Sequence, residues 1–176
     1  MNTGMRAAVA LALAVGLGAL GACSKQGDGA ATGAPHEIAH GTSCALDGML
    51  LADYPGPKAQ IHYAGRAEPD FFCDTVEMFN IYTNPEQVRA VRAVYVQDMG
   101  KTDWDQPLGA WIDARGAYYV VGSSRHGAMG PTIASFAERA AADAFAREFG
   151  GKVHAFAEIT ADMAVLDGGA LHDSTM

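Results

Sequence analysis

The sequence predicts an α+β fold of two tandem ββαβ units that pack together, with a flexible N-terminal tether and a frayed C-terminal tail. Two observations support this prediction. The order strand, strand, helix, strand occurs twice, first in residues 60–97 and again in residues 111–159. Each unit is too small to bury a full core alone, so the two are expected to pack against each other. A cleft between them is the natural place for a ligand.

Residues 1–22 have the features of a bacterial lipoprotein signal peptide. Arg6 precedes an apolar run, and Leu20-Gly21-Ala22 stands directly before Cys23, as in a lipobox. Cleavage there makes Cys23 the lipidated N-terminus of the mature protein. The alternatives are an ordinary signal peptide with an unrelated cysteine, or a transmembrane anchor, for which the apolar run is short. Ser24 after the acylated residue favours sorting to the outer membrane.

The two ends of the mature chain lack the apolar periodicity of folded elements. Residues 23–43 are rich in Gly, Ala, Ser and Thr, which predicts a flexible tether. Residues 164–176 are predicted to be a disordered tail. No later stretch is long and apolar enough to span a bilayer, so the lipid is the only membrane attachment that we expect.

The first unit is assigned to residues 44–109. Its helix begins at a capping-box pattern, Asp74 with Glu77 three residues later, and Asn84-Pro85 ends it. A segment rich in Asp and Gly closes the unit and is predicted to be a loop. The predicted strands are, in chain order, residues 60–64, 70–73 and 92–97.

The second unit is assigned to residues 110–163. Its helix, residues 138–149, is the clearest in the chain, because small and aromatic apolar residues recur at helical spacing before Gly150-Gly151. Residues 123–131 form a glycine-rich loop. The predicted strands are, in chain order, residues 111–115, 117–121, 132–136 and 153–156.

Composition and motifs exclude several classes of protein. The chain has 12 Lys and Arg against 20 Asp and Glu, a formal net charge of −8, and no basic cluster. Nucleic-acid binding needs a basic surface, so no nucleic acid is expected as a partner. No Gly-x-Ser-x-Gly, His-Glu-x-x-His or Cys-x-x-Cys motif is present. We therefore expect that the protein is not an enzyme.

The stretch Cys44-Ala-Leu-Asp-Gly-Met49 offers a thiol, a carboxylate and a thioether within six residues. Thiolates and thioethers are soft ligands that select Cu(I) among common metals, whereas Zn(II) prefers donors other than thioethers. Met129 lies between glycines in a loop that gives no packing reason to bury a thioether. Structural roles for these residues, as a turn cysteine and core methionines, are the alternative. The candidate Cu(I) ligands are Cys44, Met49 and Met129, with Cys73, Asp47 and His126 as second-rank candidates.

The other cysteine of the mature domain, Cys73, leaves two possibilities open. In an oxidising compartment it could pair with Cys44 in a disulfide. Alternatively, at least one of the two stays a thiol because it binds metal. Their spacing in the sequence does not decide between these possibilities.

The motifs together resemble the NosL family. The resemblance covers residues from about Cys44 to Ile159, and its most specific parts are the Tyr-Pro-Gly-Pro turn at residues 54–57 and the Gly-Ala-Met-Gly-Pro loop at residues 127–131. Further matching segments are Phe72-Cys73-Asp74, Asp98-Met99 with Thr102-Asp103-Trp104, Ile112-Asp113-Ala114-Arg115 and Tyr118-Tyr119-Val120-Val121-Gly122.

The resemblance implies a periplasm-facing lipoprotein that acts as a Cu(I) chaperone without catalysis. Its partners would be nitrous oxide reductase, an enzyme of denitrification, and the membrane-bound assembly complex of that enzyme. The copper would serve the reductase's tetranuclear copper–sulfide centre. The resemblance also implies a tandem ββαβ fold, and it places candidate ligands at Cys44, Met49 and Met129.

One position departs from the family pattern. Many members carry Cys-x-x-Cys-Gly-Met, and Asp47 stands where the second cysteine would be. A site with two thiolates from this motif is therefore not expected, and a mixed thiolate and thioether site is favoured.

Two other interpretations remain open at this point. The protein could be a lipoprotein adaptor of the reductase assembly machinery, with a structural Cys44–Cys73 disulfide. It could also be an enzyme of carbon–metal bond cleavage on a similar fold, which needs two free cysteines and an acid in one pocket. Cys44, Cys73 and Asp74 supply these residue types.

Overall fold

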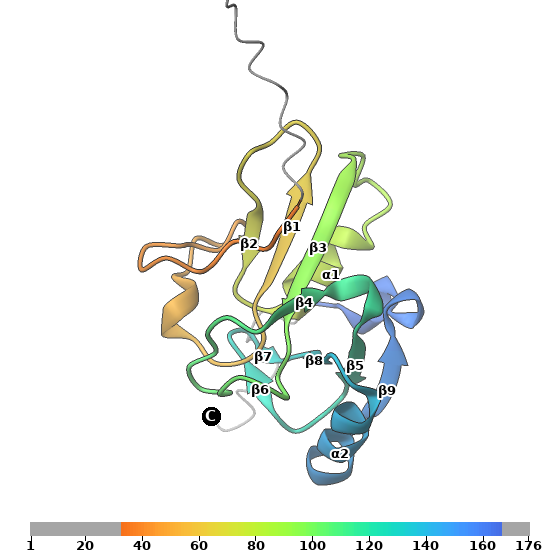
Figure 1. Cartoon of the computed structure of the whole chain (residues 1–176). Helices are drawn as coiled ribbons and strands as arrows, with labels where there is room; N and C mark the ends of the chain where they lie inside the picture. The colour runs from red at the N-terminus through yellow and green to blue at the C-terminus, as the bar shows by residue number, and fades with distance from the viewer. Residues whose placement is uncertain (1–32, 167–176) are drawn as a thin grey trace, which may run out of the picture. The chain divides into compact units, whose positions relative to one another are not determined.

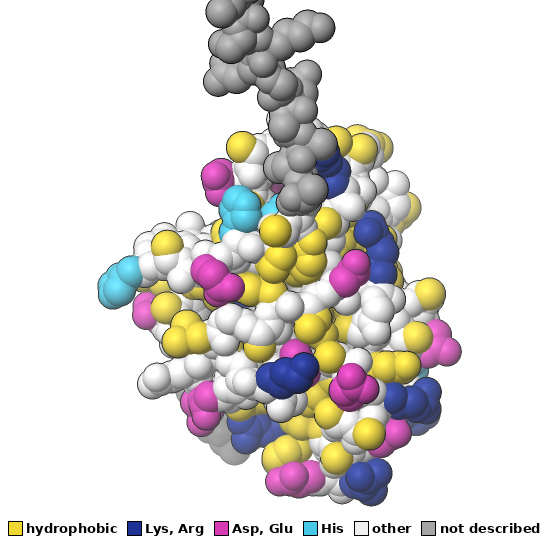
Figure 2. Space-filling model, viewed as in Figure 1, with side chains coloured by type: hydrophobic (Ala, Val, Ile, Leu, Met, Phe, Trp, Pro, Cys, Tyr) yellow, Lys and Arg dark blue, Asp and Glu magenta, His cyan; other side chains and the backbone are white. Residues whose placement is uncertain are grey.

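A computed structural model describes residues 33–166 and shows an α+β fold with a four-stranded, a three-stranded and a two-stranded antiparallel sheet and two α-helices (Figure 1). The predicted signal peptide, the lipidation residue Cys23 and residues 167–176 of the predicted tail lie outside the described residues. Neither helix in residues 33–166 has the length and apolar character needed to cross a membrane. On the face shown in Figure 2, Lys and Arg side chains are interspersed with Asp and Glu rather than gathered in one basic patch.

The first sheet has the strand order β2-β1-β3-β4. Its strands are β1 (Ala59–Tyr63), β2 (Asp70–Phe72), β3 (Val91–Gln97) and β4 (Trp111–Asp113). All neighbouring strands are antiparallel, and Ile61 in β1 lies opposite Asp70 in β2 and Val94 in β3.

Helix α1 (Thr75–Tyr82) connects β2 to β3 and starts at the predicted capping box. The Asp74 carboxylate accepts a hydrogen bond from the Val76 N–H, and the Glu77 carboxylate accepts one from the Asp74 N–H. Two donors that have no partner within the helix are thereby satisfied. The capping box is confirmed, and it fixes Glu77 one turn beyond the end of β2.

The second sheet has the strand order β8-β5-β9, with helix α2 (Arg139–Phe149) between β8 and β9. Its strands are β5 (Tyr118–Val121), β8 (Ala134–Phe136) and β9 (Lys152–Ala155). In each unit the first strand lies between the second strand and the strand after the helix, as the orders β2-β1-β3 and β8-β5-β9 show. The predicted tandem ββαβ fold is confirmed.

Between β5 and β8, the predicted glycine-rich loop contains a small hairpin. Its strands are β6 (His126–Gly127) and β7 (Gly130–Pro131), and Gly127 pairs with Gly130. Ala128 and Met129 therefore form its two-residue tip.

Three segments differ from the sequence-based prediction. The strand predicted to open the second unit is β4, which pairs with β3, so that unit's own sheet starts at β5. Residues 33–43, predicted to be flexible, pack on the first sheet, where the His36 N–H donates to Gln60 Oε1 at 2.8 Å. The start of the predicted tail also packs, because Ala164 is buried and its carbonyl accepts from Asn80 Nδ2.

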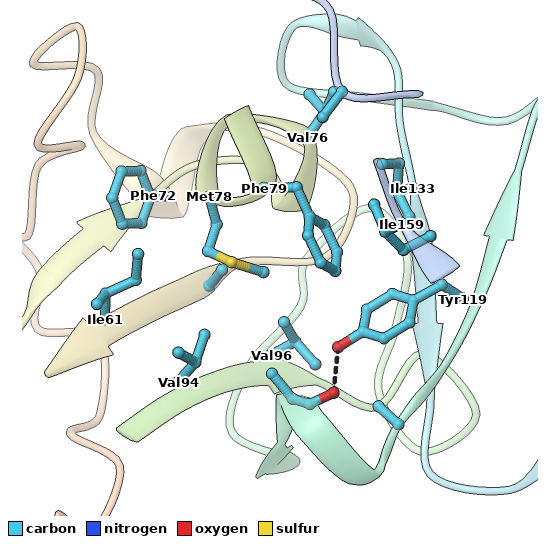
Figure 3. Packing of buried hydrophobic residues seen from close by; sticks show 14 of the residues in the cluster. Ile61, Phe72, Val76, Met78, Phe79, Val94, Val96, Tyr119, Ile133 and Ile159 are labelled. Carbon is cyan, nitrogen blue, oxygen red and sulfur yellow. Dashed lines mark hydrogen bonds between the residues drawn. The ribbon is translucent and has the colours of Figure 1, made fainter. Parts of the chain in front are cut away.

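The two units share one core, as their small size leads one to expect. Phe79 of α1 lies edge-on to Tyr119 of β5, with ring centroids 4.9 Å apart (Figure 3). The Phe79 ring also contacts Phe156. The Tyr119 hydroxyl donates to the Ala114 carbonyl at 2.6 Å, so its polar end is satisfied inside the core. Helix α1 is thereby held between the first sheet and the second unit.

Candidate metal centre

Four side chains from three segments converge at the start of α1. The ligand atoms of Cys44, Asp47, Cys73 and Glu77 all lie within 4.8 Å of one another. Cys44, Cys73 and Glu77 are buried, whereas Asp47 is exposed. We refer to these four residues as the thiol cluster. The fold brings it together over a sequence distance of 33 residues.

The loop of residues 43–50 positions Cys44 beside Met49. Ser43 and Leu50 form an isolated bridge, and the Cys44 N–H donates to the Met49 carbonyl at 2.8 Å. The loop turns at Gly48, whose φ of 80° is a conformation that glycine adopts without a side-chain clash. The Asp47 carboxylate accepts the Met49 N–H at 2.9 Å, so this acid also holds the shape of the loop.

Glu77 joins the two thiols. Its Oε2 lies 3.2 Å from the Cys44 Sγ and 3.3 Å from the Cys73 Sγ, in hydrogen bonds to both. Cys73 directly follows β2, and Glu77 lies one helical turn further along. The capping box therefore also sets the separation between the second thiol and the carboxylate.

A buried lysine lies behind the cluster. Lys58 is fully buried, and its Nζ donates to the Tyr54, Pro55 and Cys73 carbonyls at 2.7, 2.9 and 3.0 Å. Burial lowers its pKa to about 8, opposed first by the Asp74 carboxylate. The ammonium group is thus charged at neutral pH, uses all three of its protons, and ties the Tyr-Pro-Gly-Pro turn to Cys73.

The two thiols differ in acidity. The neighbouring Cys73 thiol, as the largest cause, lowers the pKa of Cys44 to about 6, and backbone N–H groups of its own loop contribute. The same contact, together with burial, raises the pKa of Cys73 far above its ordinary value. Burial, followed by the Cys44 charge, raises the pKa of Glu77 to about 8. At neutral pH the cluster therefore contains one thiolate, Cys44, and Glu77 keeps its proton.

The predicted thioethers lie against this cluster. Met49 and Met129 are half-buried and pack on the buried set of Cys44, Leu51 and Cys73. Met129 belongs to the second unit, at the tip of the β6–β7 hairpin, whereas Cys44, Met49, Leu51 and Cys73 belong to the first unit. The three residues singled out first from the sequence are thus together in the structure.

Two of the three second-rank ligand candidates lie in the thiol cluster, and one does not. Cys73 and Asp47 belong to the thiol cluster, whereas His126 lies on β6 with an exposed side chain and is not one of the four converging residues. Sequence reasoning missed Glu77, which it assigned only to the capping box. The available signal was its position four residues after Cys73, which places both on one side of the helix start.

The arrangement can bind a soft metal ion close to the surface. No disulfide joins Cys44 to Cys73, and both are free cysteines. Two thiols with two carboxylates form a set that Zn(II) accepts, while the two adjacent thioethers favour Cu(I). Leu46 and Leu50, on the loop that carries Cys44, are 42% and 41% exposed, so this loop lies at the protein surface. A bound ion is thus within reach of another protein.

Comparison with known proteins assigns the family. The NosL family model matches residues 35–164. The copper-binding lipoprotein NosL of Stutzerimonas stutzeri is 42% identical over 136 residues, which are 74% of this chain and 70% of that protein. The copper-binding lipoprotein NosL of Achromobacter cycloclastes is 40% identical over 152 residues, 84% of this chain and 78% of that protein.

A solved structure agrees with this assignment. The crystal structure of the copper chaperone NosL from Shewanella denitrificans superposes with a TM-score of 0.69 at 40% identity. The match covers 72% of this chain and 96% of that one. With a family model that spans most of the chain and relatives of this identity, the protein belongs to the NosL family.

Proposed function

We propose that this protein is a lipid-anchored, periplasm-facing Cu(I) chaperone without catalytic activity. The observation that carries the proposal is the buried pair of thiols around Glu77, with two thioethers packed against it. Relatives at about 40% identity are named as copper-binding lipoproteins, which supports both copper and the lipid anchor. The anchor would be attached at Cys23, with the outer membrane favoured.

The ligand set follows from charge and softness. Cys44 supplies the thiolate, and Met49 and Met129 supply thioethers. A single Cu(I) ion then neutralises the Cys44 charge, which suits a buried site better than an uncompensated ion. Cys73 and Glu77 lie close enough to become ligands if their protons are released. Asp47 is the solvent-exposed member of the thiol cluster.

The proposed recipient is nitrous oxide reductase, through its membrane assembly complex, for the tetranuclear copper–sulfide centre. Family membership supports this partner. The surface position of the Cys44 loop supports transfer between proteins, because a recipient can reach the ion without unfolding of the chaperone.

A genetic test separates delivery from mere binding. A denitrifying host that carries Cys44→Ala as its only copy should accumulate nitrous oxide reductase with a low copper content in its tetranuclear centre. The control Cys23→Ala separates loss of the anchor from loss of the metal site. A full copper content in the Cys44→Ala host would refute the proposal.

The adaptor interpretation is the second candidate. It requires a structural Cys44–Cys73 disulfide, whereas the structure has two free cysteines that both form hydrogen bonds with the carboxyl group of Glu77. A free-thiol count on protein purified without reductant distinguishes the two functions. A chaperone retains both thiols, and an adaptor of this kind retains neither.

A further inference from the structure

The position of Met129 depends on where the base of its hairpin, the pair Gly127 and Gly130, lies in the structure. Gly127 pairs with Gly130, and the two tip residues between them pack against the buried set of Cys44, Leu51 and Cys73. A two-residue tip has little freedom of its own. The reach of the Met129 thioether toward the thiol cluster is therefore set by the backbone of Gly127.

Gly127 lies between two fixed groups. A Cβ atom on Gly127 would overlap the Asp74 Oδ2 atom and lie 3.0 Å from the Thr132 Cβ. Gly56 also approaches Gly127 closely, because a Cβ on Gly56 would lie 2.7 Å from the Gly127 Cα. Only glycine at both positions allows this approach of the hairpin to the turn of residues 54–57 and to Asp74.

Asp74 connects the base of the hairpin to the thiol cluster. Its fully buried carboxylate accepts from the Val76 N–H at 3.0 Å and from the Thr132 hydroxyl at 2.5 Å, both at Oδ1. The other oxygen, Oδ2, faces Gly127 and has no hydrogen-bond partner within residues 33–166. Because Asp74 directly follows Cys73 and caps the helix of Glu77, it fixes the cluster and the hairpin together.

A second chain of hydrogen bonds also connects the hairpin to Cys73. The Gly56 N–H donates to the Trp104 carbonyl at 2.8 Å, and the Trp104 Nε1 donates to the His126 carbonyl at 3.0 Å. Lys58 links the same turn to the Cys73 carbonyl at 3.0 Å. The base of the hairpin is thus tied back to Cys73 along two independent routes.

We propose that Asp74, Thr132, Gly56 and Gly127 are positioning residues that hold the Met129 thioether at the thiol cluster before copper arrives. This inference rests on the proposed function, since it concerns the same Cu(I) site. Its physical effect is preorganisation: a thioether already in place loses little conformational freedom on binding. None of the four residues needs to contact the ion.

A double-mutant cycle in the full-length protein tests the inference. The probe is Cu(I), competed against a chelator of known affinity. Gly127→Ala should weaken binding by about 10-fold or more, the usual loss when the support of a ligand is removed. In a Met129→Leu background the same substitution should cost less than about twofold, because the ligand that it positions is already absent.

Two further variants keep the test decisive. Thr132→Val removes a hydrogen bond to Asp74 without adding volume, and it should show the same dependence on Met129 if Gly127→Ala does not fold. Gly116→Ala is the matched control, because its Cβ would meet nothing within 4 Å, and it should bind Cu(I) as the wild type does. X-ray absorption at the copper edge should show one sulfur ligand fewer in Gly127→Ala and in Met129→Leu.

The outcomes separate this inference from the proposed function. Equal losses from Gly127→Ala and Thr132→Val with and without Met129, while Met129→Leu itself weakens binding, would overturn the positioning role alone. Unchanged Cu(I) affinity in Met129→Leu would overturn the ligand assignment and, with it, this inference.

Discussion

Cys44 and Cys73 both form hydrogen bonds with the carboxyl group of Glu77, yet they differ in their affinity for protons. Two negative charges in a buried cluster would repel each other, so the first deprotonation makes the second harder. The thiolate settles on Cys44, where backbone N–H groups of its loop, such as that of Leu46 at 3.4 Å from Sγ, face the sulfur. This residue therefore offers the single charged soft ligand at neutral pH.

The acidity of Cys44 can be measured directly. In a Cys23→Ala background without metal, thiolate absorbance near 240 nm should rise by one thiolate with a midpoint at about pH 6, the pKa of Cys44. Cys44→Ser should abolish this step. Cys73→Ala should move it to higher pH, because the hydrogen bond from the Cys73 thiol is the largest cause of the low pKa. A wild-type transition only near pH 9 would contradict this account.

Glu77 should make the stability of the metal-free protein depend on pH in a defined direction. Its pKa rises from 4.5 to about 8 on folding, so the folded state holds the proton more tightly than the unfolded state. Its contribution is full below about pH 4.5 and is lost as the pH rises through 8. Relative to Glu77→Gln, the wild type should lose free energy of unfolding between pH 5 and pH 8 in urea denaturation. Parallel pH profiles for the two proteins would show that the carboxyl is not perturbed.

The loop of residues 43–50 is the element that places two of the three proposed ligands. Gly48→Ala should lower the free energy of unfolding by about 1 kcal/mol, because alanine is strained at a φ of 80°. A Cβ there meets nothing within 4 Å, so no clash adds to that strain. Gly41→Ala, equally free of contacts and without a positive φ, is the control and should change little. Equal urea midpoints for the two variants would argue against a strained turn at Gly48.

Elements with local signals could be predicted from the sequence, and their long-range partners could not. The capping box predicted α1, because Asp74 and Glu77 interact within one turn. The second role of Glu77 also depends on Cys44, 33 residues away, and the sequence shows only its spacing of four residues from Cys73. For the same reason the sequence does not predict that β4 pairs with β3, because a strand of three residues does not encode which sheet it joins.

At the scale of the whole molecule, helix α1 of the first unit also packs against the second unit. Phe79 contacts Tyr119 and Phe156 across the shared core, so the two units should unfold together. Phe79→Ala should destabilise the protein by about 3–5 kcal/mol, with coincident transitions in far-UV circular dichroism and tryptophan fluorescence. Val88→Ala, at a side chain that is 90% exposed, should change the stability by less than about 0.5 kcal/mol. Two separate transitions would mean that the units do not share a core.

The repeated element order predicted the fold, and donor chemistry predicted that Cys44, Met49 and Met129 would lie together. Neither could predict the supporting residues. Lys58 is buried and donates to three backbone carbonyl groups, and Gly56 and Gly127 are constrained by each other and by Asp74 and Thr132. The contacts of Gly127 exist only once the hairpin of the second unit lies on the first.

The most direct test of the account is a Cu(I) titration of the reduced protein in a Cys23→Ala background, competed against a chelator of known affinity. We expect tight binding of one Cu(I) ion per chain that is lost in Cys44→Ala and weakened in Met129→Ala. Cys73→Ala should bind more tightly than Cys44→Ala, because Cys44 carries the thiolate. Wild-type binding no tighter than that of Cys44→Ala would contradict the central claim that this cluster is a Cu(I) site.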